Sequence, residues 1–534
     1  MESFIFDQTV LKYLISFVVF SGHCLTFCSG ANVLIFVGLG EGSHFLASAA
    51  IGRELAQRGH NITALVSNAY SHRALDPRFS PLFHFELFVH SRPLEEVYDT
   101  MEWVARASAS GHFMWEMPTD FPDARSIEFS DCDAVFQNVS LMERLVATDF
   151  DVVIADPMFC CGLLLAHHLQ AKVVITSPLA WNADIGKLVG NPTNPAWIPS
   201  AGTGFPTRMT FLQRLLNVIL SGAFAPSRFI VPILEEFKTQ RGLVPGYSMV
   251  ELYQRADLVL VQTDFAVEAP IPLMPKIVPV GGLTTRPADP LPQDLEAFVQ
   301  SSGEPGIIVF SLGTYVTHMK AELIEVLAEA FSRIPQKVIW QLRGTPPETV
   351  KKRANILTLE WVPQNDLLGH IKTRAFVYQG GNNGLHEALY HAVPIVVIPV
   401  FGDQNDVAAR IVARGIGISV DFTQMTPESL TGHLKEIVEN KKYKEAMTHH
   451  SAIYHDRPQR PVERAAFWIE HVIKHGGDYM RSPVNDLVWY QHYLLDVICF
   501  LIGGLFLFLL FLFYLFRCIC KLGMKTSSRK RNKE

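Results

Sequence analysis

Short apolar runs alternate with amphipathic stretches along the first half of the chain. The runs predict strands at Asn32 to Val37, Asn61 to Ser67, Asp151 to Ala155 and Lys172 to Ser177. Helical patterns at Ser43 to Arg58 and Cys160 to Leu169 stand between them. Continuous apolar strands alternating with helices are typical of a parallel sheet covered on both faces. Residues 31–280 are therefore predicted to form a doubly wound α/β domain.

The same alternation restarts after a proline-rich stretch at 285–293. Strands are predicted at Gly306 to Ser311, Lys337 to Leu342, Ala375 to Gln379 and Pro394 to Pro399. Helices are predicted at Ala321 to Ile334, Asn383 to His391 and Asn405 to Arg414. We expect a second α/β domain at 281–485 and a ligand cleft at the carboxyl ends of the strands. The helical segment Arg460 to His475 is expected to pack across both domains.

Both ends of the chain carry apolar segments. Leu14 to Phe20 follows Lys12, and small residues end the segment, which predicts a secretory signal peptide at 1–30. An uncleaved anchor is the alternative. Residues 497–516 lack charge and are long enough to span a bilayer, and the basic tail 517–534 follows them. The sequence therefore predicts a single-pass type I membrane protein with a lumenal body; a buried core helix is the alternative for 497–516.

Charge and cysteine usage narrow the function further. The 534 residues carry a net charge of -6 without a basic stripe, which argues against nucleic-acid binding. Asn61 and Asn138 begin glycosylation sequons, as expected of a lumenal body. In the predicted lumenal body the cysteines are Cys132, Cys160 and Cys161, an odd number without zinc-ligand spacing. We expect a body held together by its core, without disulfides and without a metal site.

The stretch from Phe376 to Glu387 is the most informative part of the chain. A buried strand ends in Gly380 and Gly381, and a helix begins at once. Glycines let a ligand approach the backbone, and free N–H groups at a helix N-terminus suit a diphosphate. Glu387, one turn into the helix, is placed to accept hydrogen bonds from two ribose hydroxyls.

Two neighbouring segments complete this pattern. Trp361 and Gln364 offer an aromatic plane and an amide, which suit stacking on and reading a uracil. Asp403 and Gln404 follow the next predicted strand and suit sugar hydroxyls. Together, the three segments predict a site for a UDP-sugar.

These segments make the chain resemble the UDP-glucuronosyltransferase family over nearly its full length. The resemblance rests on Phe310 to Gly313, Trp361 to His370, the glycine segment, Phe401 to Gln404 and the terminal span. It implies the GT-B fold, with an N-terminal acceptor domain and a C-terminal donor domain. It also implies inverting transfer without a metal, and no cofactor besides the UDP-sugar co-substrate.

The resemblance also assigns roles to single residues. His44 would be the catalytic base and Asp156 the carboxylate that orients it, because an acceptor hydroxyl is a poor nucleophile until its proton leaves. The other residues that match the family's motifs would hold the UDP-sugar: Ser311, Thr314, Trp361, Gln364, Gln379, Gly381, Asn383, Glu387, Asp403 and Gln404.

One position departs from the family pattern. Gln379 stands where the family has a histidine that donates to the diphosphate, and Tyr378 stands where a small residue is usual. A glutamine amide donates a hydrogen bond without carrying charge, and charge-assisted bonds are roughly twice as strong. We expect weaker donor binding or weaker leaving-group stabilisation than with histidine.

The resemblance leaves donor and acceptor open. UDP-glucuronic acid is the first expectation, with UDP-glucose and UDP-N-acetylglucosamine as alternatives; Arg228 and Arg343 are candidates to meet a glucuronate carboxylate. The acceptor is expected to be small and lipophilic, bound by 92–142 and 182–229. The endoplasmic reticulum membrane is the expected location, and a homo- or hetero-oligomer is compatible with the sequence.

The sequence gives less support to three alternatives. A non-catalytic regulatory subunit is motivated by Gln379 alone. An NAD(P) oxidoreductase is disfavoured because the glycines at 38, 40 and 42 form an incomplete dinucleotide fingerprint. Asp131 and Asp133 have the spacing of a metal-binding acid pair but follow no nucleotide-binding strand.

Overall fold

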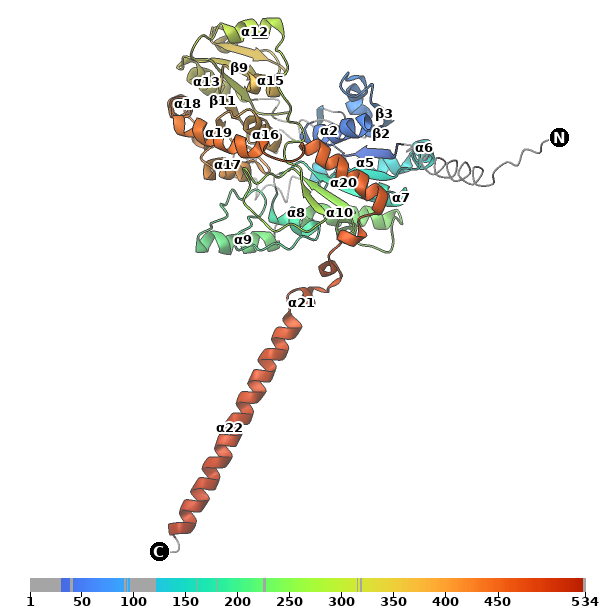
Figure 1. Ribbon diagram of the computed structural model, residues 1–534, viewed down its shortest axis with the longest axis vertical. Coiled ribbons are helices and arrows are strands. Elements are labelled where there is room, and N and C mark those ends of the chain that lie inside the picture. The colour runs from blue at the N-terminus through green and yellow to red at the C-terminus, as the bar shows by residue number, and fades with distance from the viewer. Residues whose placement is uncertain are drawn as a thin grey trace, which may run out of the picture. The chain divides into compact units, whose positions relative to one another are not determined.

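The computed structural model describes residues 30–38, 42–90, 93, 95–96, 122–159, 161–179, 181–223, 227–314, 316 and 319–531. The predicted signal peptide lies outside these residues except for Gly30. The chain divides into two compact units, 1–480 and 481–534. The larger unit contains both predicted α/β halves (Figure 1).

The first half is built on a parallel sheet in the order β3-β2-β1-β4-β5-β6-β7. Its strands are β1 (Asn32–Phe36), β2 (Asn61–Ser67), β3 (Phe83–Phe88), β4 (Val152–Ala155), β5 (Lys172–Ser177), β6 (Leu258–Val261) and β7 (Ile277–Pro279). Its helices are α2 (Ser43–Gln57), η1 (Asn68–Leu75), α5 (Pro122–Gln137), α6 (Val139–Ala147), α7 (Cys161–His168), α8 (Ala183–Leu188), α9 (Phe211–Ala223), α10 (Ser227–Gln240) and α11 (Met249–Gln254).

The second half repeats this plan in the order β10-β9-β8-β11-β12-β13. Its strands are β8 (Ile307–Ser311), β9 (Lys337–Gln341), β10 (Ile356–Leu359), β11 (Thr373–Tyr378), β12 (Ile395–Val397) and β13 (Gly417–Ser419). Its helices are α12 (Gln293–Gln300), α13 (Ala321–Ser332), α14 (Glu348–Lys351), α15 (Gln364–Gly369), α16 (Asn382–Tyr390), α17 (Gln404–Ala413), η2 (Phe422–Gln424), α18 (Pro427–Glu439) and α19 (Lys441–His455).

Each sheet is covered on both faces, as the apolar strands predict. Along β1, Val33 and Ile35 pack in one apolar cluster with α2, whereas Leu34 and Phe36 pack in another with α7. Helix α20 (Pro461–His475) follows α19 but lies beside α2 (Figure 1), and its buried side chains join the core of the first half. The strand order reverses between β1 and β4 and between β8 and β11, and such switch points are where ligands bind.

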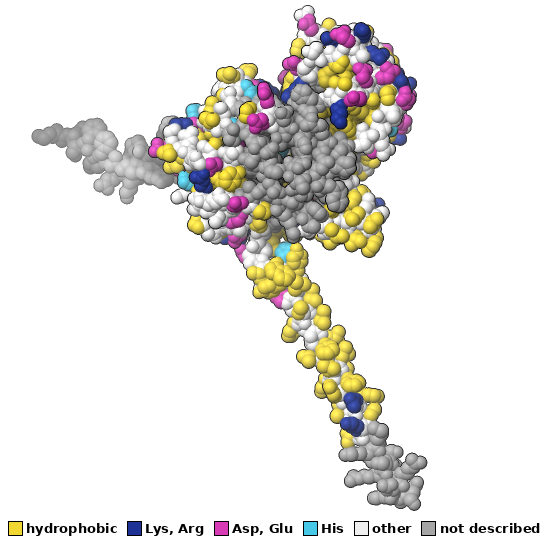
Figure 2. All heavy atoms as spheres, turned by 180° about the vertical axis from the view of Figure 1, so that it is seen from behind, with side chains coloured by type: hydrophobic (Ala, Val, Ile, Leu, Met, Phe, Trp, Pro, Cys, Tyr) yellow, Lys and Arg dark blue, Asp and Glu magenta, His cyan; other side chains and the backbone are white. Residues whose placement is uncertain are grey.

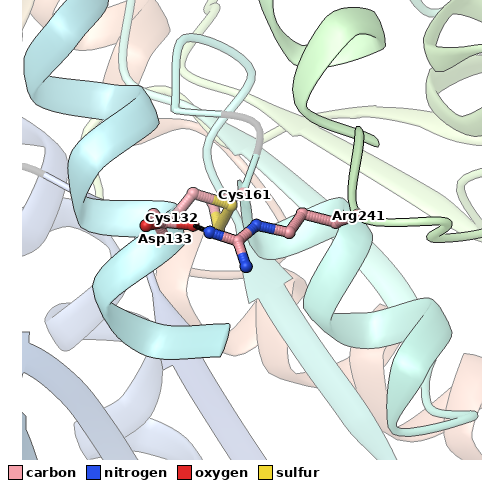
Figure 3. The surroundings of a disulfide bond; sticks show 4 residues. All are labelled: Cys132, Asp133, Cys161 and Arg241. Carbon is pink, nitrogen blue, oxygen red and sulfur yellow. Dashed lines mark hydrogen bonds and ion pairs between the residues drawn. A yellow bond between two sulfur atoms is a disulfide. The ribbon is translucent and has the colours of Figure 1, made fainter. Parts of the chain in front are cut away.

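A disulfide joins Cys132 on α5 to Cys161 on α7, 29 residues apart (Figure 3). The expectation of a body without disulfides was therefore wrong. An odd number of cysteines does not prevent two of them from meeting once helices pack on the same sheet face. Asp133, beside this bond, pairs with Arg241 (Figure 3), and Asp131 pairs with His90. Both acids thus have side-chain partners of their own, and no cluster of metal-ligating side chains occurs among the described residues.

The smaller unit contains η4 (Pro483–Asp486), α21 (Trp489–His492) and α22 (Leu495–Arg531); η3 (Asp478–Met480) closes the larger one. The segment Leu495–Leu522 is the single helix in the described residues that is long and apolar enough to cross a membrane. It is longer than the predicted span of 497–516. Hydrophobic side chains cover it along its length, with cationic side chains near its far end (Figure 2).

Candidate functional site

A cavity of about 310 Å³ lies between the carboxyl ends of the two sheets. It is lined by eight residues that the sequence assigned to a UDP-sugar: Ser311, Thr314, Trp361, Gln364, Gln379, Gly381, Asn383 and Glu387. Residues from the first half close the opposite side, among them Ser43 and Arg53 on α2. The cavity therefore brings together side chains that lie up to 76 residues apart in the second half, as the strand-end pattern predicts.

Helix α16 points its N-terminus at this cavity. Gly381 occupies the N-cap position, and no side chain caps the helix. The first backbone N–H groups of an uncapped helix lack intrahelical partners, and the helix dipole favours an anion there. Gly380 has φ +99°, and a Cβ at this position would press against Val397 and the backbone of residue 404. Glycine is therefore required for the chain to turn from β11 into α16.

Gln379 lies between two glycine-containing loops. A Cβ atom at residue 313, whose φ is +80°, would collide with the Gln379 amide nitrogen. A Cβ at residue 381 would lie 3.0 Å from the same atom. Ser311 donates to Gln341 at 2.6 Å and accepts the N–H of Gly313 at 3.1 Å, which fixes the facing loop. The Gln379 amide thus lies beside both glycines, where β11 leads into α16.

Tyr378, the other departure from the family pattern, precedes Gln379 and also lines the cavity. It is 1% exposed, stacks on Phe376 and leaves its hydroxyl without a hydrogen-bond partner. Burial, with the nearby charges of Asp403 and Glu387, raises the pKa of this phenol well above its usual value. A glycine at 384 makes room for its ring.

Glu387 faces the cavity one turn into α16. Gln364 donates to one carboxylate oxygen at 2.6 Å and Thr284 to the other at 3.4 Å. Burial raises the pKa of Glu387 to about 7, against the lowering effect of these bonds and of Arg286. The carboxylate keeps acceptor capacity for ligand hydroxyls. Trp361 is 53% exposed and offers its ring beside Gln364.

His44 and Asp156 lie on the neighbouring edge of the first sheet. His44 is the second residue of α2 and Asp156 directly follows β4, and their side chains meet at 2.6 Å between Nδ1 and Oδ2. The second oxygen of Asp156 accepts the N–H of Met158 at 2.7 Å. His44 is 9% exposed and Asp156 is 1% exposed. A carboxylate so held fixes the imidazole with Nε2 as its remaining reactive nitrogen.

Electrostatics favour protonation of His44. Burial lowers the pKa of His44, but the charge and hydrogen bond of Asp156 and the charge of Asp403 outweigh it, so the pKa is raised overall. Neither Asp403 nor Gln404 lines the 310 Å³ cavity. Gln404 instead accepts the N–H groups of Val400 and Phe401 at 2.8 and 3.0 Å, so it holds the loop before α17.

Several cavity residues escaped the sequence analysis, chiefly Arg53, Arg78, Thr284 and Arg286. The last two belong to the stretch between the sheets, where no strand-end pattern marks them. Leu46, Ala50 and Arg53 lie on one face of α2, and this helical spacing was the signal that could have identified Arg53. Arg343, proposed for a sugar carboxylate, is not among the cavity-lining residues, and the side chain of Arg228 lies outside the described residues.

The predicted glycosylation sites lie at the surface of the first half. Asn61 is exposed at the start of β2, and Asn138 is partly exposed as the N-cap of α6. Both stay predictions.

Comparison with known proteins places this site in a family. The family model described as "UDP-glucoronosyl and UDP-glucosyl transferase" matches residues 32–533. UDP-glucuronosyltransferase 2B1 of Rattus norvegicus is 37% identical over 93% of this chain and 96% of its own length. UDP-glucuronosyltransferase 2A3 of Homo sapiens is 36% identical over 96% of this chain and 97% of its own length.

Solved structures agree on the fold. Os79 from O. sativa, crystallised with U2F and trichothecene, matches with a TM-score of 0.59 and 16% identity over 83% of this chain and 100% of that one. The glycotransferase of kitacinnamycin matches with a TM-score of 0.57 and 19% identity over 83% of this chain and 99% of that one. The fold is GT-B, as expected, and the chain belongs to the UDP-glucoronosyl and UDP-glucosyl transferase family.

Proposed function

We propose that this protein transfers a glycosyl group from a UDP-sugar to the hydroxyl of a small lipophilic acceptor, with inversion at the anomeric carbon. The observation that carries the proposal is the buried His44–Asp156 pair at 2.6 Å beside a cavity suited to a nucleoside diphosphate. The uracil stacks on Trp361, Glu387 accepts from the ribose, and the diphosphate lies against the N-terminus of α16.

In this mechanism Nε2 of His44 takes the proton of the acceptor hydroxyl as its oxygen attacks the anomeric carbon. Asp156 holds the ring and stabilises the imidazolium that forms. The bond from the anomeric carbon to the UDP oxygen breaks on the opposite face, which inverts the centre. Free N–H groups of α16 and the Gln379 amide stabilise the charge on the departing diphosphate. None of these steps requires a metal.

Glucuronic acid is the sugar we propose first, because the relatives are named UDP-glucuronosyltransferases. Glucose and N-acetylglucosamine are the alternatives, since the family description names glucosyl transfer as well. We also propose that the body lies in the lumen of the endoplasmic reticulum. The Cys132–Cys161 disulfide supports an oxidising compartment, and the apolar helix α22 supports a membrane anchor.

The proposal is tested with membranes that contain the protein or its His44→Ala variant. Each is incubated with a simple phenol and, in turn, UDP-glucuronic acid, UDP-glucose and UDP-N-acetylglucosamine, and the conjugate is detected by mass. A conjugate from one donor, absent with the variant, fixes the reaction and the sugar together. A folded protein that binds UDP but forms no conjugate from any donor would contradict transfer and favour a regulatory subunit.

A further inference from the structure

Gln262, which directly follows β6, connects the acceptor half of the molecule to the donor-binding helix α16. It is fully buried, and its backbone N–H donates to the carbonyl of Ser177 at 3.1 Å. Its own carbonyl accepts from Asn382 Nδ2 at 2.9 Å and from His386 Nε2 at 3.3 Å. Its side-chain Nε2 donates to Asn383 Oδ1 at 3.0 Å.

The bonds to Asn382, Asn383 and His386 reach the first two turns of α16. Asn382 is held a second time, because its Nδ2 also donates to the carbonyl of Pro178 at 3.2 Å. Burial lowers the pKa of His386 to about 4, so near neutral pH this imidazole is uncharged and donates one N–H to Gln262. The N-terminus of α16 is therefore fixed by the strand ends of β5 and β6 in the other half.

The hydrogen bond between the side chains of Gln262 and Asn383 orients the Asn383 amide. Because Gln262 donates to Oδ1 of Asn383, the amide NH₂ group of Asn383 is left for the cavity that this residue lines. An NH₂ group attracts phosphate oxygens. The reversed amide would instead present a carbonyl oxygen, which a diphosphate repels.

We infer that Gln262 is a positioning residue for the donor: it sets which end of the Asn383 amide faces the diphosphate. The inference rests on the proposed function, because it assumes that Asn383 meets the phosphate groups of UDP. Gln262 itself is not among the residues that line the cavity. It acts through Asn383. Because Gln262 belongs to the acceptor half and Asn383 to the donor-binding half, their hydrogen bond makes donor binding depend on the acceptor half.

The first test measures equilibrium binding of UDP to the solubilised full-length protein and to Gln262→Met, which keeps the side-chain length but cannot donate. We expect UDP affinity to fall about five- to tenfold, the effect of one lost oriented hydrogen bond. KM for the UDP-sugar rises by a similar factor, and kcat changes less. Tyr454→Phe is the matched control, because it removes another buried hydrogen bond, to Gly281 at 3.1 Å, away from Asn383.

A second variant covers the case in which Gln262→Met does not fold. Asn383→Asp keeps an acceptor for Gln262 Nε2 but turns a carboxylate oxygen toward the cavity. UDP affinity should then fall further than in Asn383→Ala, although both lack the NH₂ group. Equal UDP affinities of Asn383→Asp and Asn383→Ala, or a Gln262→Met variant that binds UDP like the Tyr454→Phe control, would overturn the inference. Wild-type protein that fails to bind UDP would instead remove the proposed function.

Discussion

At the residue scale, the proposed base depends on the carboxylate behind it. Asp156 sits directly after β4 and is anchored by the N–H of Met158, so it has one oxygen free for His44. Burial alone would lower the pKa of His44, yet Asp156 and Asp403 raise it. The imidazole is neutral, and able to accept a proton, only above this raised pKa.

We therefore predict that kcat/KM falls as pH drops through the raised pKa of His44, and that Asp156→Asn moves this acid limb to lower pH. Without the carboxylate, burial is the larger influence and lowers the pKa. The plateau rate should also fall by about 10²- to 10⁴-fold, because the imidazolium loses its partner. The measurement is kcat/KM across about pH 5 to 9, the range in which histidines titrate. An acid limb that stays in place would mean that another group titrates.

Eight cavity-lining residues were predictable because each follows a recognisable strand or loop pattern. The same pattern selected Gln404 for sugar hydroxyls, but it did not reveal that this side chain accepts two backbone N–H groups of its own loop. A turn of this kind depends on local geometry that residue types alone do not encode. The same holds for Gln262, whose bonds join segments about 120 residues apart.

Gln379 provides a second residue-scale prediction. Its neutral amide lies between Gly313 and Gly381, where a donor to the diphosphate would stand. Gln379→His should raise turnover roughly fivefold, because a charge-assisted bond is worth about 1 kcal/mol more than a neutral one. Initial rates at saturating UDP-sugar test this, with Gln379→Met as the control that removes the donor. Unchanged turnover in the histidine variant would show that this position does not act on the leaving group.

At the element scale, the strands and helices that the sequence predicted agree with the structure within one or two residues. Helix α2 was expected at Ser43 to Arg58 and runs from Ser43 to Gln57. The strands β3, β6, β7, β10 and β13 were not predicted. Side chains of β3 and β10 are only partly buried, which weakens their apolar pattern. Strand β6 is buried but has only four residues, and β7 and β13 have three each. The disulfide between α5 and α7 was missed because cysteine spacing does not reveal which helices share a sheet face.

This disulfide leads to a prediction about stability. Replacing both Cys132 and Cys161 by alanine should cost about 3 to 4 kcal/mol, the loop-closure entropy that the bond removes from the unfolded chain. The denaturation midpoint of the variant should fall, and dithiothreitol should lower the midpoint of the wild type but leave the variant unchanged. Cys499→Ala is the control, since Cys499 is a free cysteine in α22. A reductant effect that persists in the double variant would contradict a bond between these two residues.

At the scale of the whole molecule, the cavity and the apolar helix lie in different compact units. The unit through Met480 contains both sheets and the cavity, and the unit from Arg481 contains the apolar helix. A 28-residue helical segment is about 42 Å long, enough for a hydrocarbon core of roughly 30 Å.

Deleting residues 495–534 should therefore release the protein from membrane integration without loss of UDP binding. The full-length chain should stay in the pellet after extraction with alkaline carbonate, and the truncated chain should move to the supernatant. UDP affinity, measured on both forms, should agree within a factor of about two, since no described residue of the deleted segment lines the cavity. Truncated protein that resists alkaline extraction would place the membrane anchor elsewhere.

The most direct test of the account compares glycosyl transfer with UDP affinity in His44→Ala. If His44 is the base, transfer should fall by about 10²- to 10⁴-fold while the affinity for UDP stays the same, because His44 lies outside the nucleotide cavity. Transfer that persists near the wild-type rate, with UDP still bound, would contradict the proposed role of the His44–Asp156 pair.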